Sequence, residues 1–349
     1  MDISRRFFGG ALAAGAAGLA AASLSACSTD SPTAPAAATP GGADLRAGSG
    51  AHTTLGATKH IDAGVLNVGY AEFGPGTGQP VILVHGWPYD PYSYADVGPL
   101  LAAAGYRVLV PFLRGYGPTT FLSAQTVRNA QQSAIARDIV DFMDALHIDK
   151  AILGGFDWGA RTVDIVAALW PQRCKAIVAV SGYIVTQQAA QQQPLAPEAE
   201  LGWWYQYYFA TERGRLGYSR NRHDFNKLIW QRASPQWNFD DATYNRSAAA
   251  FDNPDHVDIV VHNYRWRLSL APGEPQYDAY EQQLATGPAI TVPAITIASD
   301  FDGAAKDGKP YRGKFTGKYE HRILDSIGHN VPQEAPRPFA QAIIDADHL

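Results

Sequence analysis

The sequence is poor in cysteine and in charge, and both shortages narrow the classes of protein that it can encode. Only two of its 349 residues are cysteines, Cys27 and Cys174. Charged residues make up 17% of the chain, the formal net charge is −5, and no run of Lys or Arg follows the first few residues. We therefore expect no nucleic acid as a partner. The ten histidines show no metal-ligand spacing such as H-E-x-x-H, so we also expect no metal and no cofactor.

Apolar residues are plentiful by comparison. They form 46% of the chain, which is enough to bury a substantial core in a protein of this length. There is no internal repeat. The length fits one large domain, or one domain that carries an inserted lobe.

The first 27 residues read as a targeting segment. Arg5 and Arg6 precede two phenylalanines in "MDISRRFFGG", and the stretch "ALAAGAAGLAAASLSA" that follows is only mildly apolar. This pattern resembles a twin-arginine export signal, and "LSAC" at Leu24 to Cys27 resembles a lipoprotein processing box. An uncleaved membrane helix needs about twenty strongly apolar residues, whereas glycines interrupt this stretch. We expect a protein exported to the cell envelope and anchored in a membrane by a lipid on Cys27.

Residues 28–57 are rich in Ser, Thr, Pro, Ala and Gly and offer almost nothing to bury, so they predict a disordered tether. With Cys27 carrying lipid, Cys174 has no cysteine with which to form a disulfide. No histidine is close to Cys174 in the sequence. We expect it to be an inert buried thiol.

From residue 58 onward, short apolar runs alternate with helix-length segments. "PVILVHG", "YRVLVPF", "KAILGG" and "CKAIVAVSG" read as buried strands, and "SAIARDIVDFMDALHI" as an amphipathic helix. The alternation stops over residues 183–288, which read as an inserted helical cap rich in aromatic residues, and resumes over 289–349. The pattern predicts an α/β fold with a mostly parallel sheet, formed by residues 58–182 and 289–349.

The motif "GGFDWGA" places Asp157 at the apex of a predicted strand-to-helix turn. Gly155 and Gly159 permit the strained backbone of such a turn, and the helix that follows stabilises negative charge at the apex. A carboxylate is already a nucleophile at neutral pH, so it needs a base only for a second step that activates water. Asp157 is the predicted nucleophile.

Partners for this nucleophile follow later in the chain. His329 in "GHN" is the candidate base, and Asp300 or Asp302 in "SDFDG" is the candidate acid, since spacing does not separate the two. His85 in "HGWP" is expected to hold a loop in place.

Five motifs together carry a family resemblance: "HGWP", "RGYG", "GGFDWGA", "DFDG" and "GHN". Over residues 58–349 the chain resembles the α/β-hydrolase superfamily, in its branch with aspartate nucleophiles, which holds epoxide hydrolases and haloalkane or haloacid dehalogenases. The resemblance implies that Asp302 orients His329, with Asp300 as second choice. It also implies an oxyanion hole formed by the backbone N–H groups of Trp87 and Trp158.

The leaving group decides between the two reactions. An epoxide oxygen leaves as a basic alkoxide that needs a proton donor, whereas a halide needs only N–H groups. "YQYYF" and "HNYRW" resemble the epoxide hydrolase segments that supply two lid tyrosines, which map onto Tyr205 and Tyr264. Tyr207 and Tyr208 are substitutes for Tyr205. An aromatic residue at Trp87 is also similar to epoxide hydrolases.

We therefore expect a hydrolase that opens a small, apolar epoxide to a diol through an ester on Asp157. The first alternative is a dehalogenase with the same nucleophile, in which Trp158 and a lid aromatic residue bind halide. The second is a non-catalytic ligand-binding lipoprotein, which would have no reason to keep nucleophile, acid and histidine together.

Overall fold

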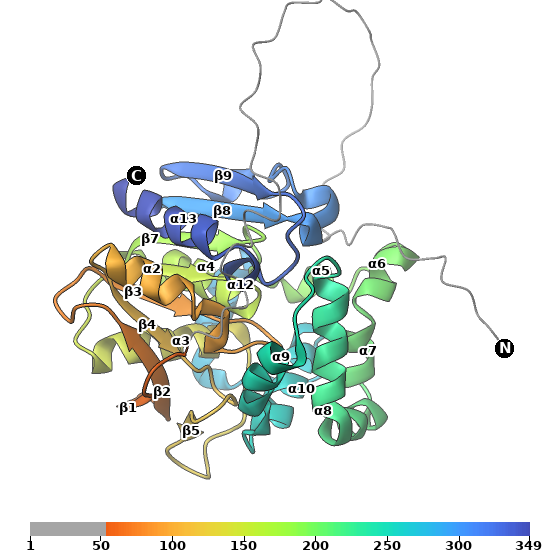
Figure 1. Ribbon diagram of the computed structural model, residues 1–349. Helices are drawn as coiled ribbons and strands as arrows, with labels where there is room; N and C mark the ends of the chain where they lie inside the picture. Colours follow the sequence, from red (N-terminus) through yellow and green to blue (C-terminus); the bar gives the residue numbers. More distant parts are fainter. Residues whose placement is uncertain (1–53) are drawn as a thin grey trace, which may run out of the picture.

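The computed structural model describes residues 54–349, which form a nine-stranded sheet with helices on both faces (Figure 1). The strand order is β1-β2-β4-β3-β6-β7-β8-β9, and β5 pairs with β2. The strands are β1 Lys59–Ala63, β2 Leu66–Phe73, β3 Pro80–Val84, β4 Arg107–Pro111, β5 Thr120–Phe121, β6 Ala151–Gly155, β7 Cys174–Val180, β8 Ala294–Ser299 and β9 Tyr319–Leu324. Every pair from β4 to β9 is parallel, and the pairs that include β2 are antiparallel. The predicted, mostly parallel sheet is confirmed.

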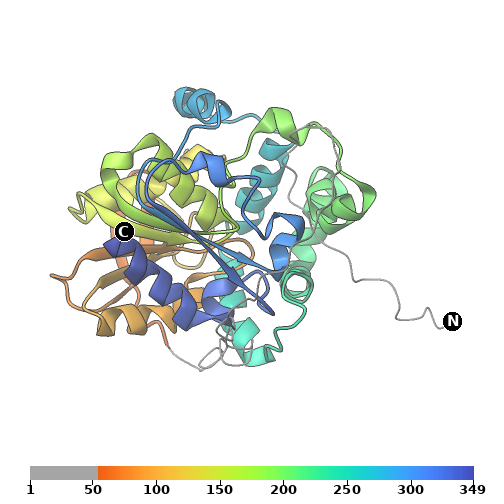
Figure 2. The same cartoon turned by 90° about the horizontal axis from the view of Figure 1, so that it is seen from above.

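The central strands are uniformly apolar because helices cover them on both sides. All five residues of β6 and the last four of β3 are buried. The helices of the sheet domain are α2 Val97–Ala103, α3 Gln132–Ala145, α4 Trp158–Leu169, α12 Val331–Glu334 and α13 Pro336–His348. Helix α13 packs beside α2, and α3 beside α4, on opposite faces of the sheet (Figure 2).

The chain between β7 and β8 is helical and lies beside the sheet domain, at the place where the sequence predicts a cap (Figure 1). Its α-helices are α5 Gln188–Gln191, α6 Pro197–Gly202, α7 Trp204–Phe209, α8 Glu212–Ala233, α9 Asp241–Ala248, α10 His256–Arg267 and α11 Asp278–Ala285. Helices α7, α8 and α10 pack on one another through aromatic residues that include Phe209, Tyr218 and Tyr264. The cap therefore places a cluster of aromatic residues beside the sheet domain.

The predicted signal and the lipidation site at Cys27 lie outside the described residues, as does most of the predicted tether. Leu55, which the predicted tether includes, is buried against the core. Within residues 54–349, the structure contains no helix whose length and apolar character would let it cross a membrane. Cys174 is buried in β7, where burial raises the pKa of its thiol to about 12, in keeping with an inert side chain.

Candidate active site

Asp157 stands on a strained turn between β6 and α4. Its φ of 53° and ψ of −122° place it outside the regions that L-residues prefer. A methyl group at Gly159 would collide with the carbonyl of Val84, and one at Gly155 would collide with the backbone of Gly159. The two glycines thus let the turn close tightly, as the motif predicts.

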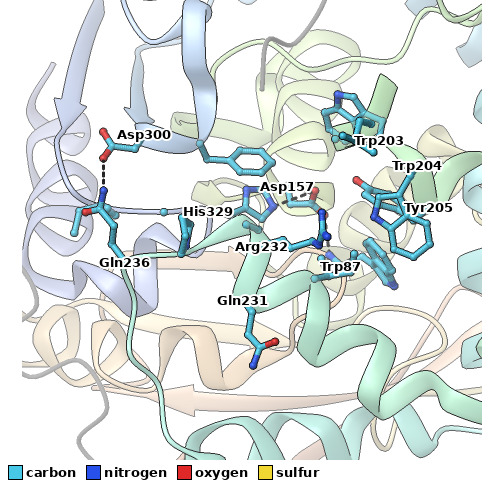
Figure 3. Close-up of a pocket in the computed structure, with 18 of the residues that line it drawn as sticks. Trp87, Asp157, Trp203, Trp204, Tyr205, Gln231, Arg232, Gln236, Asp300 and His329 are labelled. Atoms are coloured by element: carbon cyan, nitrogen blue, oxygen red, sulfur yellow. Dashed lines mark hydrogen bonds and ion pairs between the residues drawn. The ribbon is translucent and has the colours of Figure 1, made fainter. Parts of the chain in front are cut away.

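The two oxygens of Asp157 have different neighbours. Oδ1 accepts a hydrogen bond of 2.7 Å from the backbone N–H of Trp87, and Oδ2 lies 3.4 Å from Nε2 of His329 (Figure 3). The loop after β3 can approach this closely because residue 86 is glycine, since a Cβ there would collide with Asp157. The structure therefore brings Asp157, His329 and Trp87 together at the carboxyl ends of the parallel strands, where α/β proteins bind ligands.

Asp157 is held as a carboxylate. Burial alone would raise its pKa, but the hydrogen bond and charge of His329, the charge of Arg161 and the N–H of Trp87 outweigh burial and lower it. An ionised carboxylate at neutral pH is the form that attacks carbon.

The loop that carries His329 is tied to the end of cap helix α8. The backbone N–H of His329 donates to Oγ of Ser234 at 2.9 Å and to the carbonyl of Ala233 at 3.2 Å. Ser234 in turn donates to the buried carboxylate of Glu334 at 2.6 Å, and Glu334 accepts the N–H of Gly328 at 2.8 Å. The sequence analysis did not identify Ser234 or Glu334. The only signal for Glu334 was its place as a lone acidic residue in an apolar, proline-rich segment after "GHN".

The two candidate acids have different surroundings. Asp302 is 7% exposed, and its Oδ2 accepts the N–H of Ser299 at 2.7 Å. Burial raises the pKa of Asp302, against the effects of the Ser181 hydroxyl, the Ser299 N–H and the charge of His329.

Asp300, in contrast, is more exposed and pairs with Lys306. It also accepts a hydrogen bond from Gln236, toward which it points in Figure 3. Nδ1 of His329 forms no hydrogen bond with any residue in 54–349. The orienting role of Asp302 therefore stays a prediction, and Asp300 is engaged elsewhere.

Tyr205 on α7 and Tyr264 on α10 pack against Trp87, whose backbone N–H binds Asp157. Their ring centroids are 5.3 Å apart, and they lie 5.0 Å and 5.1 Å from the ring of Trp87. Burial raises the pKa of both phenols, as does the negative charge of Asp157, so both are O–H donors at neutral pH. Of the alternatives, Tyr207 is 48% exposed and donates to Glu200, and Tyr208 stacks on Phe225.

The side chain of Trp87 is fixed by a buried hydrogen-bond chain that sequence reasoning missed. Nε1 of Trp87 donates to the hydroxyl of Tyr218 at 3.0 Å, and that hydroxyl lies 3.0 Å from Nε2 of His256. Nδ1 of His256 lies 2.9 Å from the carbonyl of Gly115 in the "RGYG" loop. Burial lowers the pKa of His256 to about 3, so the ring is neutral. These hydrogen bonds connect Trp87 to the cap and to the sheet domain.

His85 has the structural role expected of it. Its Nε2 accepts the N–H of Leu113 at 3.1 Å, so Nδ1 carries the proton and donates to the carbonyl of Gly86 at 2.9 Å. Burial lowers its pKa to about 4. His85 thereby joins the loops after β3 and β4.

Trp158 is the first residue of α4, directly after Asp157. Its predicted part in the oxyanion hole stays a prediction. The indole Nε1 of Trp158 is buried and has no hydrogen-bond partner among residues 54–349.

These groups open onto a cavity of about 530 Å³ between the sheet and the cap (Figure 3). Asp157, Trp87 and His329 contribute to its lining together with Trp203, Tyr205 and Phe301. A cavity of this size suits a small organic substrate. In the part of the chain that the structure describes, no cluster of three His, Cys, Asp or Glu side chains could hold a metal ion.

The comparison with known families agrees with this geometry. Residues 79–331 match the alpha/beta hydrolase fold family, and the chain belongs to it. Among known proteins, the chain is 24% identical over 309 residues to epoxide hydrolase A of Mycobacterium tuberculosis, covering 82% of this chain and 95% of that protein. It is 25% identical over 321 residues to the epoxide hydrolase of Caballeronia sordidicola, covering 83% and 93% respectively.

Solved structures extend the comparison. The crystal structure of a candidate epoxide hydrolase from Klebsiella pneumoniae is 59% identical, has a TM-score of 0.82, and covers 87% of this chain and 99% of its own. Potato epoxide hydrolase I shares the fold at 20% identity, with a TM-score of 0.67 over 83% of this chain and 98% of its own. The chain is an enzyme of the epoxide hydrolase kind.

Proposed function

We propose that this enzyme hydrolyses an epoxide to a diol through a covalent hydroxyalkyl ester on Asp157. The observation that supports the proposal is that the two oxygens of the Asp157 carboxylate have different partners. Trp87 holds Oδ1 and His329 lies beside Oδ2, in a cavity that Tyr205 lines.

In the first step, Oδ2 of Asp157 attacks a ring carbon and the bond from that carbon to the epoxide oxygen breaks. Oδ1 is bound by Trp87 N–H, which leaves Oδ2 as the attacking atom and makes Oδ1 the carbonyl oxygen of the ester. Tyr205 and Tyr264 donate to the epoxide oxygen and supply the proton that its departing alkoxide needs. Their protonated state at neutral pH supports this role.

In the second step, His329 takes a proton from water while the resulting hydroxide attacks Cγ of the ester. The negative charge that develops on Oδ1 receives hydrogen bonds from the backbone N–H groups of Trp87 and Trp158. The bond from Cγ to Oδ2 then breaks, and the protonated His329 gives its proton to the departing diol oxygen. Asp157 regains its second oxygen from water as a carboxylic acid and releases its proton to solvent, and solvent returns one proton to the tyrosine.

His329 needs an acid on its other nitrogen to stabilise its charged form. We propose Asp302 for this role, because it is buried after β8 and the charge of His329 affects its pKa. Asp302 would accept a hydrogen bond from Nδ1 of His329, which has no partner within residues 54–349.

A second candidate reaction is hydrolytic dehalogenation by the same nucleophile. The observation in its favour is the buried indole Nε1 of Trp158, the residue after Asp157, which has no hydrogen-bond partner within residues 54–349 and could donate a hydrogen bond to a halide. The two tyrosines have no part to play in that reaction, since a halide leaves without a proton.

A turnover assay separates the two reactions. Wild type and Asp157→Ala are supplied with styrene oxide and, separately, with a chloroalkane, and diol and chloride release are measured. Diol formed by the wild type and not by the variant supports the proposal. Chloride release without diol would favour dehalogenation, and no product from either substrate would overturn both.

We further propose that the enzyme is an exported lipoprotein anchored through Cys27. The support is the order of features in the sequence: Arg5 and Arg6, a mildly apolar stretch, then "LSAC". Expression with labelled palmitate should label the wild type and leave Cys27→Ala unlabelled, and Arg5→Lys with Arg6→Lys should keep the protein in the cytoplasm. Label on the Cys27→Ala variant would contradict the anchor.

A further inference from the structure

The imidazole of His329 lies against the ring of Phe301, the residue between the two candidate acids. The two ring centroids are 4.0 Å apart and the ring planes are tilted by 39°. Aromatic pairs usually keep about 4.5–7 Å between centroids, and two rings side by side in one plane do not come as close as this pair. The Phe301 ring therefore covers one face of the imidazole, and both residues line the cavity.

Two other aromatic rings are near His329, but they lie farther away. The ring centroids of Tyr89 and Phe156 are 5.8 Å and 6.0 Å from that of the imidazole. His329 is only 6% exposed. Phe301 is thus the aromatic residue in closest contact with a base that has little water around it.

The turn that carries Phe301 is held by the end of β8. Oγ of Ser299 accepts the N–H of Phe301 at 3.3 Å, and the carboxylate of Asp302 accepts the N–H of Ser299 at 2.7 Å. These two hydrogen bonds fix the backbone on both sides of the Phe301 ring.

The same turn is joined to the loop that carries His329. The backbone N–H of Asp300 donates to the carbonyl of Ile327 at 3.0 Å, and the carboxylate of Asp300 accepts the N–H of Ser326 at 3.0 Å. The contact between the rings of Phe301 and His329 is therefore a built feature, because hydrogen bonds connect the two backbones that present them.

The titratable groups around His329 approach its nitrogens or its backbone. Oδ2 of Asp157 lies 3.4 Å from Nε2, and Asp302 is the acid proposed for Nδ1. Glu334 accepts hydrogen bonds from backbone N–H groups of the His329 loop. Burial raises the pKa of the Tyr89 phenol well above its usual range, so that group is neutral. The other charged residues that line the cavity are Glu198, Arg232 and Asp300.

We propose that Phe301 is a positioning residue that stabilises the positively charged form of His329 through the π face of its ring. A cation within about 6 Å of an aromatic centroid is attracted by the negative face of the ring, and the attraction is larger where water is excluded. A neutral imidazole lacks this attraction. The contact therefore becomes stronger when His329 takes a proton from water, which is the second step of the proposed reaction.

This inference rests on the proposed function and adds a residue to it. An interaction that strengthens only as the proton arrives lowers the barrier to ester hydrolysis and leaves ester formation unchanged. The ring of Phe301 also removes water from the imidazolium, which opposes the charge. The test must therefore change the π face and keep the shape and the apolar character of the side chain.

Fluorine on the Phe301 ring meets this requirement. Mono-, di- and trifluorophenylalanine are introduced at this position by amber suppression, and rapid-quench kinetics with styrene oxide separate ester formation from ester hydrolysis. Fluorine withdraws electrons from the π face, so the rate constant of hydrolysis should fall with each fluorine, by about tenfold over the series. The rate constant of ester formation should stay the same.

Phe315 is the matched control for fluorination. It is a buried phenylalanine that stacks on Tyr319, with centroids 4.8 Å apart, and not on a residue of the site. Fluorine at Phe315 should change neither step. Equal hydrolysis rates across the Phe301 series would overturn the inference, and so would an equal fall in both steps, which would mean that fluorine disturbs the site as a whole.

An NMR titration of the His329 ring keeps this test separate from the reaction. It uses labelled histidine and no substrate, with the signal assigned by comparison with His329→Gln, so it applies even if styrene oxide is not opened and the proposed function fails. The ring signals should titrate at lower pH as fluorine is added to Phe301, because the weakened π face favours the cation less. A titration that does not move across the series would contradict the inference, whereas one that moves without any turnover would overturn only the proposed reaction.

Discussion

Nε2 of His329 lies 3.4 Å from Oδ2 of Asp157, on the opposite side of the carboxylate from the Trp87 N–H that binds Oδ1. In the proposed mechanism, the oxygen beside His329 forms the ester, and the oxygen held by Trp87 bears the negative charge during hydrolysis. Two loops, one after β3 and the other after β9, therefore contact the two oxygens of one carboxylate.

The two lid tyrosines should be needed for ring opening. Tyr205→Phe and Tyr264→Phe each remove one O–H donor, and the double variant should lower kcat/KM for styrene oxide by about 10²–10⁴-fold, the usual contribution of general acid catalysis. Tyr207→Phe is the control, because that side chain is exposed and bonds to Glu200. Undiminished turnover by the double variant would refute the role of the phenols.

Ser234 should affect the second step more than the first. Ser234→Ala removes the hydroxyl that links the His329 N–H to Glu334, so His329 loses its fixed position and kcat should fall by up to about 10²-fold. Rapid-quench kinetics should show the ester forming at the wild-type rate and then accumulating.

Ser219→Ala, on the same helix but away from the His329 loop, serves as the control for this measurement. Slower ester formation in Ser234→Ala, with no accumulation, would contradict a role in the hydrolytic step.

The sequence predicts those parts of the fold and site whose signals are local. Strands such as β3 and β6 are continuous apolar runs, and the turn at Asp157 carries its own glycines. Strand β1, "KHIDA", was not predicted because it lies at the edge of the sheet, is largely exposed and has no apolar pattern. Its strand character comes from pairing with β2.

The supporting residues of the site could not be predicted, because their roles depend on contacts between distant segments. Tyr218 meets Trp87 across 131 positions of sequence, and Glu334 meets Ser234 across 100.

Tyr218 should contribute to stability through the buried hydrogen bonds that it forms with Trp87 and His256. Tyr218→Phe leaves Nε1 of Trp87 and Nε2 of His256 buried without their partner, so unfolding free energy should fall by about 1–3 kcal/mol. Urea denaturation measures this change, with Tyr207→Phe as control. A difference close to zero would show that water replaces the hydroxyl.

His256 should make stability depend on acid pH. Its pKa is about 3 in the folded protein against an ordinary value of 6.5, so the unfolded chain binds the extra proton first as the pH falls. Stability from the neutral ring is complete above pH 6.5 and is lost progressively toward pH 3, by up to about 1.4 kcal/mol per pH unit.

Urea midpoints measured between pH 7 and pH 4 check this dependence. His256→Gln should show a shallower decline than the wild type, and His60→Gln, which changes an exposed histidine, should follow the wild type. Parallel curves for wild type and His256→Gln would contradict the low pKa.

The ester on Asp157 is the central claim, and the mass of a trapped intermediate tests it most directly. His329→Gln removes the base, so incubation with styrene oxide should add the mass of one whole substrate molecule to the protein. Peptide mapping should place this mass on Asp157, and Asp157→Ala with His329→Gln should show none. An unmodified His329→Gln protein, or an adduct that forms only from haloalkanes and lacks the mass of hydrogen halide, would contradict the account.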